Sequence, residues 1–199
     1  LTRPYSLTRL TVTTTFGNNR VALIIDAYSR KIVGWDLSRD LSSAGALRVL
    51  KMALRALPDG SSLIHHSDRG VQYWHSAYVK ELDKRNILIS MTESGDPLEN
   101  ATAERVNGIL KNEWIDKRHL KSWHDAQFYV EKIIGLYNNQ RPHQSISFLT
   151  PDLVHRSGIS TDRKWKNYYP QKISQGEILP NLSFDAESQV ITENETKSL

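Results

Sequence analysis

The sequence predicts an α/β fold built on one mixed, five-stranded sheet, and two observations lead to that prediction. Segments rich in strand-forming residues lie close together at 10–16, 21–25 and 32–37, as expected for an antiparallel meander. The following residues alternate between helical and strand patterns, and helical crossovers place the later strands parallel to the first. We therefore expect strands of both directions in a single sheet that is flanked by helices.

The three segments of the meander are joined by short links. Residues 10–16 are rich in β-branched side chains, and residues 21–25 form the longest apolar run of the chain. Residues 16–19 contain a glycine and two asparagines and predict a turn, and residues 26–31 predict a tight connection to the third strand. Both links are short enough to join neighbouring antiparallel strands.

The later helices and strands are indicated by apolar spacing and by capping residues. Four leucines, starting at Leu47, are spaced i, i+3, i+7 and i+10 along one helix face, between a serine cap at 42–43 and Pro58. Asn100 is expected to cap the helix that follows it. The other predicted elements, in chain order, are a strand at 63–68, a helix at 77–84, a strand at 87–91, a loop at 92–98 and helices at 101–115 and 123–138.

Charge divides the chain into a basic body and an acidic end. The whole chain carries a net charge of +4, while residues 177–199 hold five acids and one lysine, which leaves +8 on the first 176 residues. A basic body favours a polyanionic partner, nucleic acid first, although a merely soluble basic protein has the same balance. We expect residues 1–155 to form the folded domain. Residues 156–199 are expected to form a tail, first basic and aromatic, then acidic and mostly disordered.

Composition excludes several classes of protein. No apolar run approaches the length of about 18 residues that a membrane span requires. No opening pattern resembles a signal peptide, and the absence of cysteine excludes disulfides and cysteine-based zinc sites. These features predict a cytoplasmic protein. The chain begins with Leu1 in place of Met, which is expected of a fragment of a longer product.

Two acidic residues stand out as candidates for chemistry. The segment LIHHSDRGVQY runs from an apolar pair into Asp68 at the predicted end of a strand, and Glu104 lies early in the predicted helix 101–115. Lys111 falls on the same helix face as Glu104, seven residues later. Taken singly, Asp68 is a loop residue that caps a turn, Glu104 is an acid stabilised by the helix dipole, and Lys111 is a solvated charge.

Four blocks of sequence resemble the DDE transposases of bacterial insertion sequences, which share the retroviral-integrase catalytic core. The blocks are IDAYSRKIVGW, LIHHSDRGVQY, ISMTESGDPLENATAERVNGILKNEW and LYNNQRPHQSISFLTPDLVH, and they span about residues 21–155 in the family's order and spacing. The resemblance implies an RNase H-like fold. It identifies residues 1–155 as the catalytic core, with residues 1–20 divergent.

The resemblance also implies a site for metal-dependent phosphoryl transfer. Two divalent ions about 3.5–4 Å apart can hold the attacking and leaving oxygens of a displacement at phosphorus, and Mg²⁺ prefers oxygen ligands. By similarity, Asp68 and Glu104 are the second and third catalytic carboxylates and bind Mg²⁺ or Mn²⁺. Lys111 matches a basic residue that contacts phosphate near the transposon end.

The first catalytic carboxylate of the family is absent from this chain. In the family it lies in a Thr-Asp-x-Thr-Tyr block about 18 residues before the equivalent of Asp26, and counting back gives Thr8. Residues 1–25 contain neither Asp nor Glu. We interpret the N-terminal region as divergent, through a frameshift or a truncated insertion-sequence copy. Threonine is neutral and a poorer Mg²⁺ ligand than a carboxylate, so catalysis is expected to be impaired; Asp26 itself is expected to be a turn residue.

Three further motifs have ordinary alternatives to a functional role. Arg141 and His143, in YNNQRPHQS, can donate hydrogen bonds to DNA phosphates, or their loop can pack the last helix on the core. The stretch 165–169 is either an aromatic and basic DNA surface or a hydrophobic strap over the domain, which we prefer. His65 and His66 point to opposite faces of a strand, so at most one can join Asp68, and we expect supporting roles.

Two functions remain as hypotheses. The first is the catalytic core of an insertion-sequence transposase, which nicks transposon-end DNA and joins it to a target. The alternative is a catalytically dead remnant that binds only DNA or other transposase subunits. The resemblance implies a homo-oligomer on paired DNA ends, associated with the nucleoid when bound to DNA, and a separate helix-turn-helix segment or subunit. A nuclease acting on RNA–DNA hybrids is disfavoured, because the YNNQRPHQS block belongs to the transposase resemblance.

Overall fold

The structure is a computed structural model, and it divides the chain into two units, Leu1–Lys164 and Trp165–Leu199. It describes residues 3–14, 17–39, 43–58, 60–67, 73, 75–91 and 101–161, with the backbone alone at 3–14, 17, 18 and 91. Four predictions therefore fall outside the described residues: the position of Asp68, the loop at 92–98, the helix cap at Asn100 and the tail after residue 161. The boundary at residue 155 stays a prediction.

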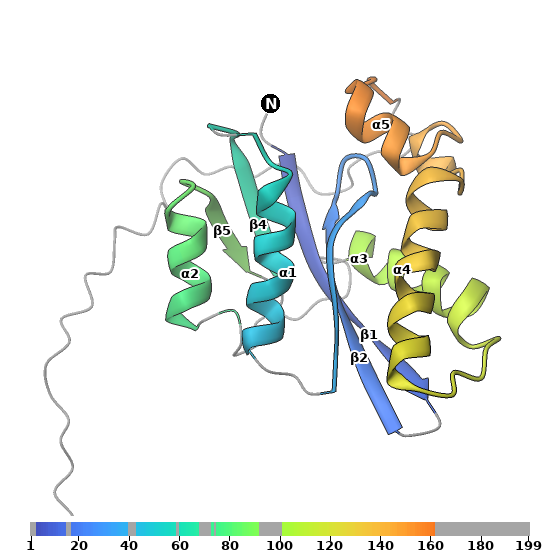
Figure 1. Cartoon of the computed structure of the whole chain (residues 1–199). Helices are drawn as coiled ribbons and strands as arrows, with labels where there is room; N and C mark the ends of the chain where they lie inside the picture. The colour runs from blue at the N-terminus through green and yellow to red at the C-terminus, as the bar shows by residue number, and fades with distance from the viewer. Residues whose placement is uncertain are drawn as a thin grey trace, which may run out of the picture. The chain divides into compact units, whose positions relative to one another are not determined.

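One mixed sheet forms the centre of the first unit (Figure 1). Its order is β3-β2-β1-β4-β5, with β1 antiparallel to β2, β2 antiparallel to β3, and β4 parallel to both β1 and β5. The five-stranded mixed sheet predicted from the sequence is confirmed, and the first strand lies at its centre. The strands are β1 (Arg3–Thr14), β2 (Gly17–Asp26), β3 (Ile32–Ser38), β4 (Leu63–Ser67) and β5 (Leu88–Met91).

The first hairpin is longer than its sequence predicts. Strand β1 begins at Arg3, before the β-branched stretch, because its first residues pair with β2 on one side and β4 on the other. Strand β2 begins at Gly17, inside the predicted turn, since the pairing with β1 continues to Thr14. Backbone pairing on two sides extends a strand beyond what local composition favours.

The helices follow the prediction with two differences. The helix predicted at 101–115 is α-helical only to Leu110 and then forms one π-helical turn, in which the amide of Asp116 donates to the carbonyl of Lys111 at 3.0 Å. Helix α5 was not predicted, although Thr150 and Pro151 suit its cap and first position. The helices are α1 (Ser43–Arg55), α2 (Ser76–Asp83), α3 (Ala101–Leu110), the π-helical turn η3 (Lys111–Ile115), α4 (Trp123–Asn139), the 3₁₀ turn η4 (Gln144–Ile146) and α5 (Pro151–Ser157).

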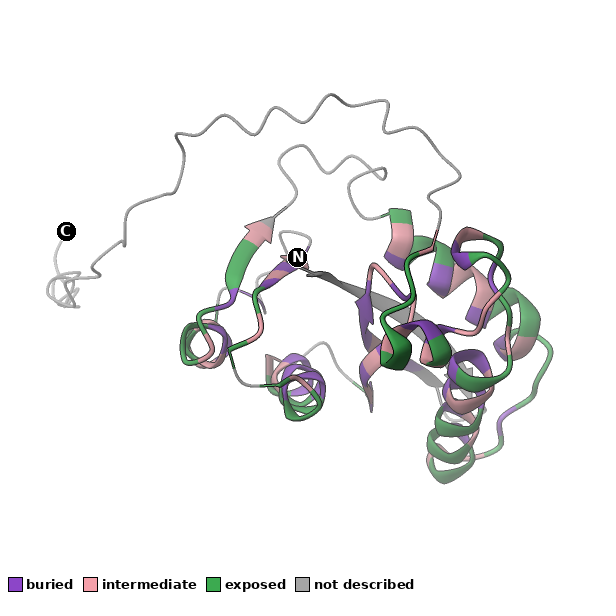
Figure 2. Cartoon of the chain, turned by 90° about the horizontal axis from the view of Figure 1, so that it is seen from above, coloured by how far each residue is buried: buried purple, intermediate pink, exposed green. Residues whose placement is uncertain are grey.

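Two apolar clusters lie on opposite faces of the sheet. Leu23 and Ile25 of β2 pack with residues of α3 and α4, whereas Ile24 between them packs with residues of α1 and α2. This alternation is the period-two pattern of a strand that is buried on both faces. Figure 2 shows the buried residues of α1 and α4 among exposed ones, as expected of helices with one apolar face. Within the described residues, no helix is long and apolar enough to cross a membrane.

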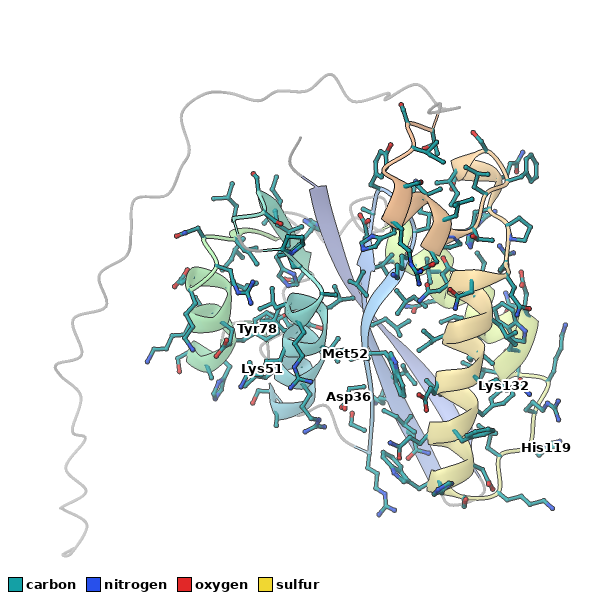
Figure 3. All side chains as sticks on the ribbon, turned by 45° about the horizontal axis from the view of Figure 1, so that its top comes forward. Asp36, Lys51, Met52, Tyr78, His119 and Lys132 are labelled. Atoms are coloured by element: carbon teal, nitrogen blue, oxygen red, sulfur yellow. The ribbon has the colours of Figure 1, made fainter. Side chains whose placement is uncertain are left out.

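Helix α1 approaches the sheet most closely at Gly34 of β3. A Cβ atom at this position would lie 2.5 Å from the carbonyl oxygen of Val49 on α1. On the same strand, the amide of Trp35 donates to Met52 Sδ at 3.4 Å, and Figure 3 shows Met52 between α1 and β3. Glycine at position 34 therefore sets the distance between this helix and the sheet.

We expect Gly34→Ala to lower the free energy of unfolding by about 1–3 kcal/mol, because the added methyl group overlaps the backbone of α1. The measurement is urea-induced unfolding. Gly135→Ala on α4 is the matched control, since nothing lies within 4 Å of its Cβ position and alanine favours a helix over glycine by about 1 kcal/mol. Equal stability of the two variants would contradict the close packing of α1 on β3.

Candidate functional site

The position of the missing carboxylate, Thr8, lies on the central strand. Across the antiparallel pair Thr8 is opposite Leu23 of β2, whose side chain packs in the cluster under α3 and α4. Across the parallel pair, Ser6 is opposite His66 of β4. Thr8 follows Ser6 by two residues, and Asp68 follows His66 by two residues in the sequence. Since β4 ends at Ser67, the place of Asp68 beside β1 stays a prediction.

Glu104 lies on α3, which contacts β1. The neighbouring residues Ala103 and Val106 are buried in the cluster on that face of the sheet, while Glu104 is exposed. In the described part of the chain, its carboxylate has no hydrogen-bond or ion-pair partner. Lys111 is also exposed and begins the π-helical turn, so the predicted face with a carboxylate and a positive charge is present on the surface.

The described residues hold one of the predicted metal ligands, Glu104. No group of three histidine, aspartate or glutamate side chains that could bind a metal ion occurs among them. An exposed, unpaired carboxylate is the oxygen donor that Mg²⁺ prefers. Glu104 thus has the chemistry of a divalent-cation ligand, threonine at position 8 is neutral, and the metal site itself stays a prediction.

The two histidines of β4 face opposite sides of the sheet, as expected. His65 is 1% exposed, and its Nε2 lies 3.0 Å from the hydroxyl of Tyr78. Burial, together with the nearby His66, lowers the pKa of His65 to about 4, so this ring is neutral at pH 7. His66 Nδ1 lies 3.1 Å from the hydroxyl of Ser90 on β5. Both rings thus support β4 through packing and hydrogen bonds.

The asparagines of the YNNQRPHQS block bind the protein's own backbone. Asn138 accepts a hydrogen bond from the amide of Ile32 at 2.9 Å and donates to its carbonyl at 3.0 Å. Asn139 donates to the carbonyl of Gly135, one turn earlier in α4. The first of these contacts joins α4 to the start of the edge strand β3, which is a packing role.

Arg141 and His143 also make contacts within the domain. The Nε of Arg141 donates to Glu113 at 2.8 Å, and its second nitrogen contacts the same carboxylate. His143 is 7% exposed, with its ring edge-on to Tyr137 at 4.8 Å between centroids. Burial lowers the pKa of His143 to about 4, assisted by the charge of Arg141. These contacts favour the packing alternative, and DNA contact by the two residues stays a prediction.

Asp26 is a turn residue, as expected, but its carboxylate also binds a distant helix. Its side chain is fully buried and accepts from the amide of Tyr28 at 3.0 Å and from the hydroxyl of Ser29 at 2.7 Å. His155 Nδ1 of α5 lies 2.9 Å from the same carboxylate. Nothing in the local sequence indicates this contact, because the two residues are 129 positions apart.

The hydrogen bonds around Asp26 determine its ionisation. Burial alone raises the pKa of the Asp26 carboxyl, but the bonds with His155, Ser29 and the amide of Tyr28 outweigh burial and hold it below its ordinary value. The residue is therefore a buried carboxylate whose charge is satisfied by three partners. We call residues 26–31 the 26–31 turn. The Asp26 carboxylate joins this turn to α5 through its hydrogen bonds.

Sequence comparison places two matches to one domain family along the chain. Residues 7–97 and residues 85–151 each match a family model described as Integrase core domain. The matched region includes every predicted site residue. The first match begins at residue 7, so it includes β1 from the residue before Thr8.

Insertion-sequence transposases are among the curated relatives. The transposase for insertion sequence element IS629 of Shigella sonnei is 34% identical over 132 residues, which cover 66% of this chain and 44% of the relative. Transposase InsF for insertion sequence IS3A of Escherichia coli is 32% identical over 141 residues, which cover 70% of this chain and 49% of the relative. The chain thus spans about half the length of the curated relatives it matches.

Solved structures confirm the predicted RNase H-like fold class. The chain superposes on a simian T-cell lymphotropic virus intasome, with a TM-score of 0.63 and 15% identity, over 87% of this chain and 60% of that one. It superposes on the HTLV-2 integrase catalytic core domain in complex with magnesium, in its trimeric form, with a TM-score of 0.57 and 16% identity, over 76% of this chain and 95% of that one. For a Mos1 transposase paired-end complex with the left transposon end, the TM-score is 0.55 and the identity 12%, over 68% of this chain and 48% of that one. These low identities show the fold alone.

We expect Asp26→Asn to lower the free energy of unfolding by about 2–3 kcal/mol at pH 7, the order of hydrogen bonds to a buried charge. Since folding depresses the pKa of Asp26, its contribution is present above the unfolded-state value near 3.8 and is lost as the pH falls through the folded-state value. The stability difference between parent and variant should therefore shrink at acidic pH. Urea unfolding at a series of pH values measures it, and a constant difference would contradict this account.

Proposed function

This chain belongs to the integrase core family of insertion-sequence transposases, and from that premise we propose that it is the DNA-joining core of such a transposase. It would bind transposon-end DNA and join a 3′ end to a target by Mg²⁺- or Mn²⁺-dependent phosphoryl transfer. The observation that carries the proposal is the exposed carboxylate of Glu104, which has no partner among the described residues and lies on α3, a helix that contacts the central strand β1.

Two acidic residues would hold the metal. We assign Asp68 and Glu104 as its carboxylate ligands, on their match to the family's motif and on the exposure of Glu104. A bound divalent ion supplies activation of the attacking oxygen and charge stabilisation of the leaving oxygen. Lys111 follows Glu104 by seven residues on the same helix face. It would bind a phosphate of the DNA end and orient the strand beside the site.

Thr8 supports the second candidate function. If the negative charge at this position is required, the chain is a remnant that binds DNA or other transposase subunits without joining them. Removing one group that stabilises charge in the transition state lowers the rate by about 10²–10³-fold. The two candidates therefore differ in rate, and they share the same fold and the same DNA surface.

The proposed partners are transposon ends, target DNA and further copies of the chain. The trimeric HTLV-2 core and the Mos1 paired-end complex support this proposal, because both are assemblies of proteins with the same fold. We also propose that a helix-turn-helix segment or subunit, separate from this core, reads the DNA sequence.

We expect Thr8→Asp to raise the rate of strand transfer by about 10²–10³-fold, since it restores a charged oxygen ligand on β1. The measurement is joining of a labelled transposon end to a target duplex with Mn²⁺. Thr8→Asn is the matched neutral control, and Thr8→Asp with Glu104→Gln should return to background. A parent chain that joins ends as fast as Thr8→Asp would refute the account of the defect.

Lys111→Gln should weaken binding to DNA of any sequence and reduce the slope of log affinity against log salt by about 1, as expected for one lost phosphate contact. Fluorescence anisotropy over a range of salt concentrations measures this slope. The control is Lys51→Gln, an exposed lysine of α1 on the opposite face of the sheet (Figure 3). If both variants change the slope equally, Lys111 has no specific place at the DNA surface.

A further inference from the structure

The 26–31 turn contacts the helix that carries Glu104. The Nη1 of Arg30 donates to Thr102 Oγ1 at 3.0 Å, and Thr102 lies in the first turn of α3, two residues before Glu104. The same nitrogen contacts the carbonyl of Ala27, and Nε donates to the hydroxyl of Ser145 at 3.3 Å. One guanidinium group thus joins the 26–31 turn, α3 and η4.

Arg30 is itself held in place through its backbone. Its φ angle is 69°, in the left-handed region that residues with a side chain rarely adopt. Its amide donates to the carbonyl of Asp26 at 2.7 Å, and its carbonyl accepts from the hydroxyl of Tyr137 at 3.0 Å. Because the buried Asp26 carboxylate closes the same turn, the guanidinium projects from a fixed backbone.

The first turn of α3, residues 101–104, has few other anchors among the described residues. Ala101 is exposed, Ala103 packs in the core, and Glu104 has no partner, so Thr102 is the residue of this turn that is tied by a side-chain hydrogen bond. The buried side chains of Ala103, Val106 and Leu110 determine which face of α3 meets the sheet. The directional hydrogen bond at Thr102 adds a second constraint on rotation, at the first turn.

We propose that Arg30 is a positioning residue, which through Thr102 fixes the rotation of α3 and so the place where Glu104 presents its carboxylate to a divalent ion. The role of Glu104 rests on the proposed function, whereas the contact does not. Mg²⁺ requires ligands at about 2.0–2.1 Å in near-ideal octahedral geometry, and misplacement by about 1 Å can lower a rate by about 10²-fold. Arg30 acts without touching the ion or the DNA.

The test compares two substitutions in the Thr8→Asp chain. Thr102→Val removes the hydroxyl and keeps the shape of the side chain, whereas Thr102→Ser keeps the hydroxyl. The readout is the Mn²⁺ concentration for half-maximal strand transfer. We expect Thr102→Val to raise it about tenfold and Thr102→Ser to restore it, while thermal unfolding of the two variants stays close.

Further variants identify Arg30 as the partner. Arg30→Met should raise the Mn²⁺ requirement as Thr102→Val does, and the double variant should add little, because both remove one contact. Arg55→Met, at an exposed arginine of α1, controls for the loss of a positive charge. Additive effects of Arg30→Met and Thr102→Val would contradict a shared contact.

The outcomes separate this inference from the proposed function. An equal Mn²⁺ requirement in Thr102→Val and Thr102→Ser overturns the positioning role and leaves the proposed function standing. If Thr8→Asp joins no DNA, the proposed function fails. The positioning role of Arg30 is then tested by amide hydrogen exchange in α3. Thr102→Val, but not Thr102→Ser, should then speed amide exchange in α3, and unchanged exchange overturns the inference.

Discussion

The buried carboxylate of Asp26 is the constraint on which the arrangement of the helices depends. A charge without partners in the interior destabilises a fold by several kcal/mol, on the order of 3–5 when one partner is removed, so the turn and the helix that supplies His155 must stay together. The ion pair of Lys31 with Asp152, at 2.9 Å, joins the same two segments. From this turn Arg30 reaches α3. One short link between two strands therefore contacts two helices, α3 and α5, that lie far from it in the sequence.

The scaffold of the site and its chemistry are separable in this protein. Threonine favours strands, and without a carboxylate at position 8, β1 pairs there with β2 and, up to Ser6, with β4. The fold is therefore kept while a negative charge is absent. On α3, Glu104 is exposed, and its carboxylate has no partner in the part of the chain that the structure describes. Stability thus depends on the 26–31 turn and the two apolar clusters, whereas the proposed activity would depend on a few carboxylates.

Local patterns predict the sheet and most helices, because burial leaves a periodic trace in the sequence. The apolar run at 21–25 lies in β2, and Leu47, Leu50 and Leu54 lie in α1, which ends before the fourth predicted leucine, Leu57. Contacts between distant residues leave no such trace, which is why His155 was missed as the partner of Asp26. The short helix α5 and the π-helical turn after Leu110 were also missed, although Thr150 and Pro151 are a local signal for the start of α5. The predicted strand end and helix spacing made Asp68, Glu104 and Lys111 candidates, and only the resemblance indicated their roles.

The central claim is that Asp68 and Glu104 meet beside position 8 of β1 in a cation site that lacks one carboxylate. The most direct measurement is a crystal structure of the protein grown with Mn²⁺, with anomalous scattering used to locate the ion. The account predicts manganese between the carboxyl groups of Asp68 and Glu104, at partial occupancy in the parent and at higher occupancy in Thr8→Asp. Carboxyl groups on opposite sides of the molecule, or manganese bound elsewhere, would contradict it.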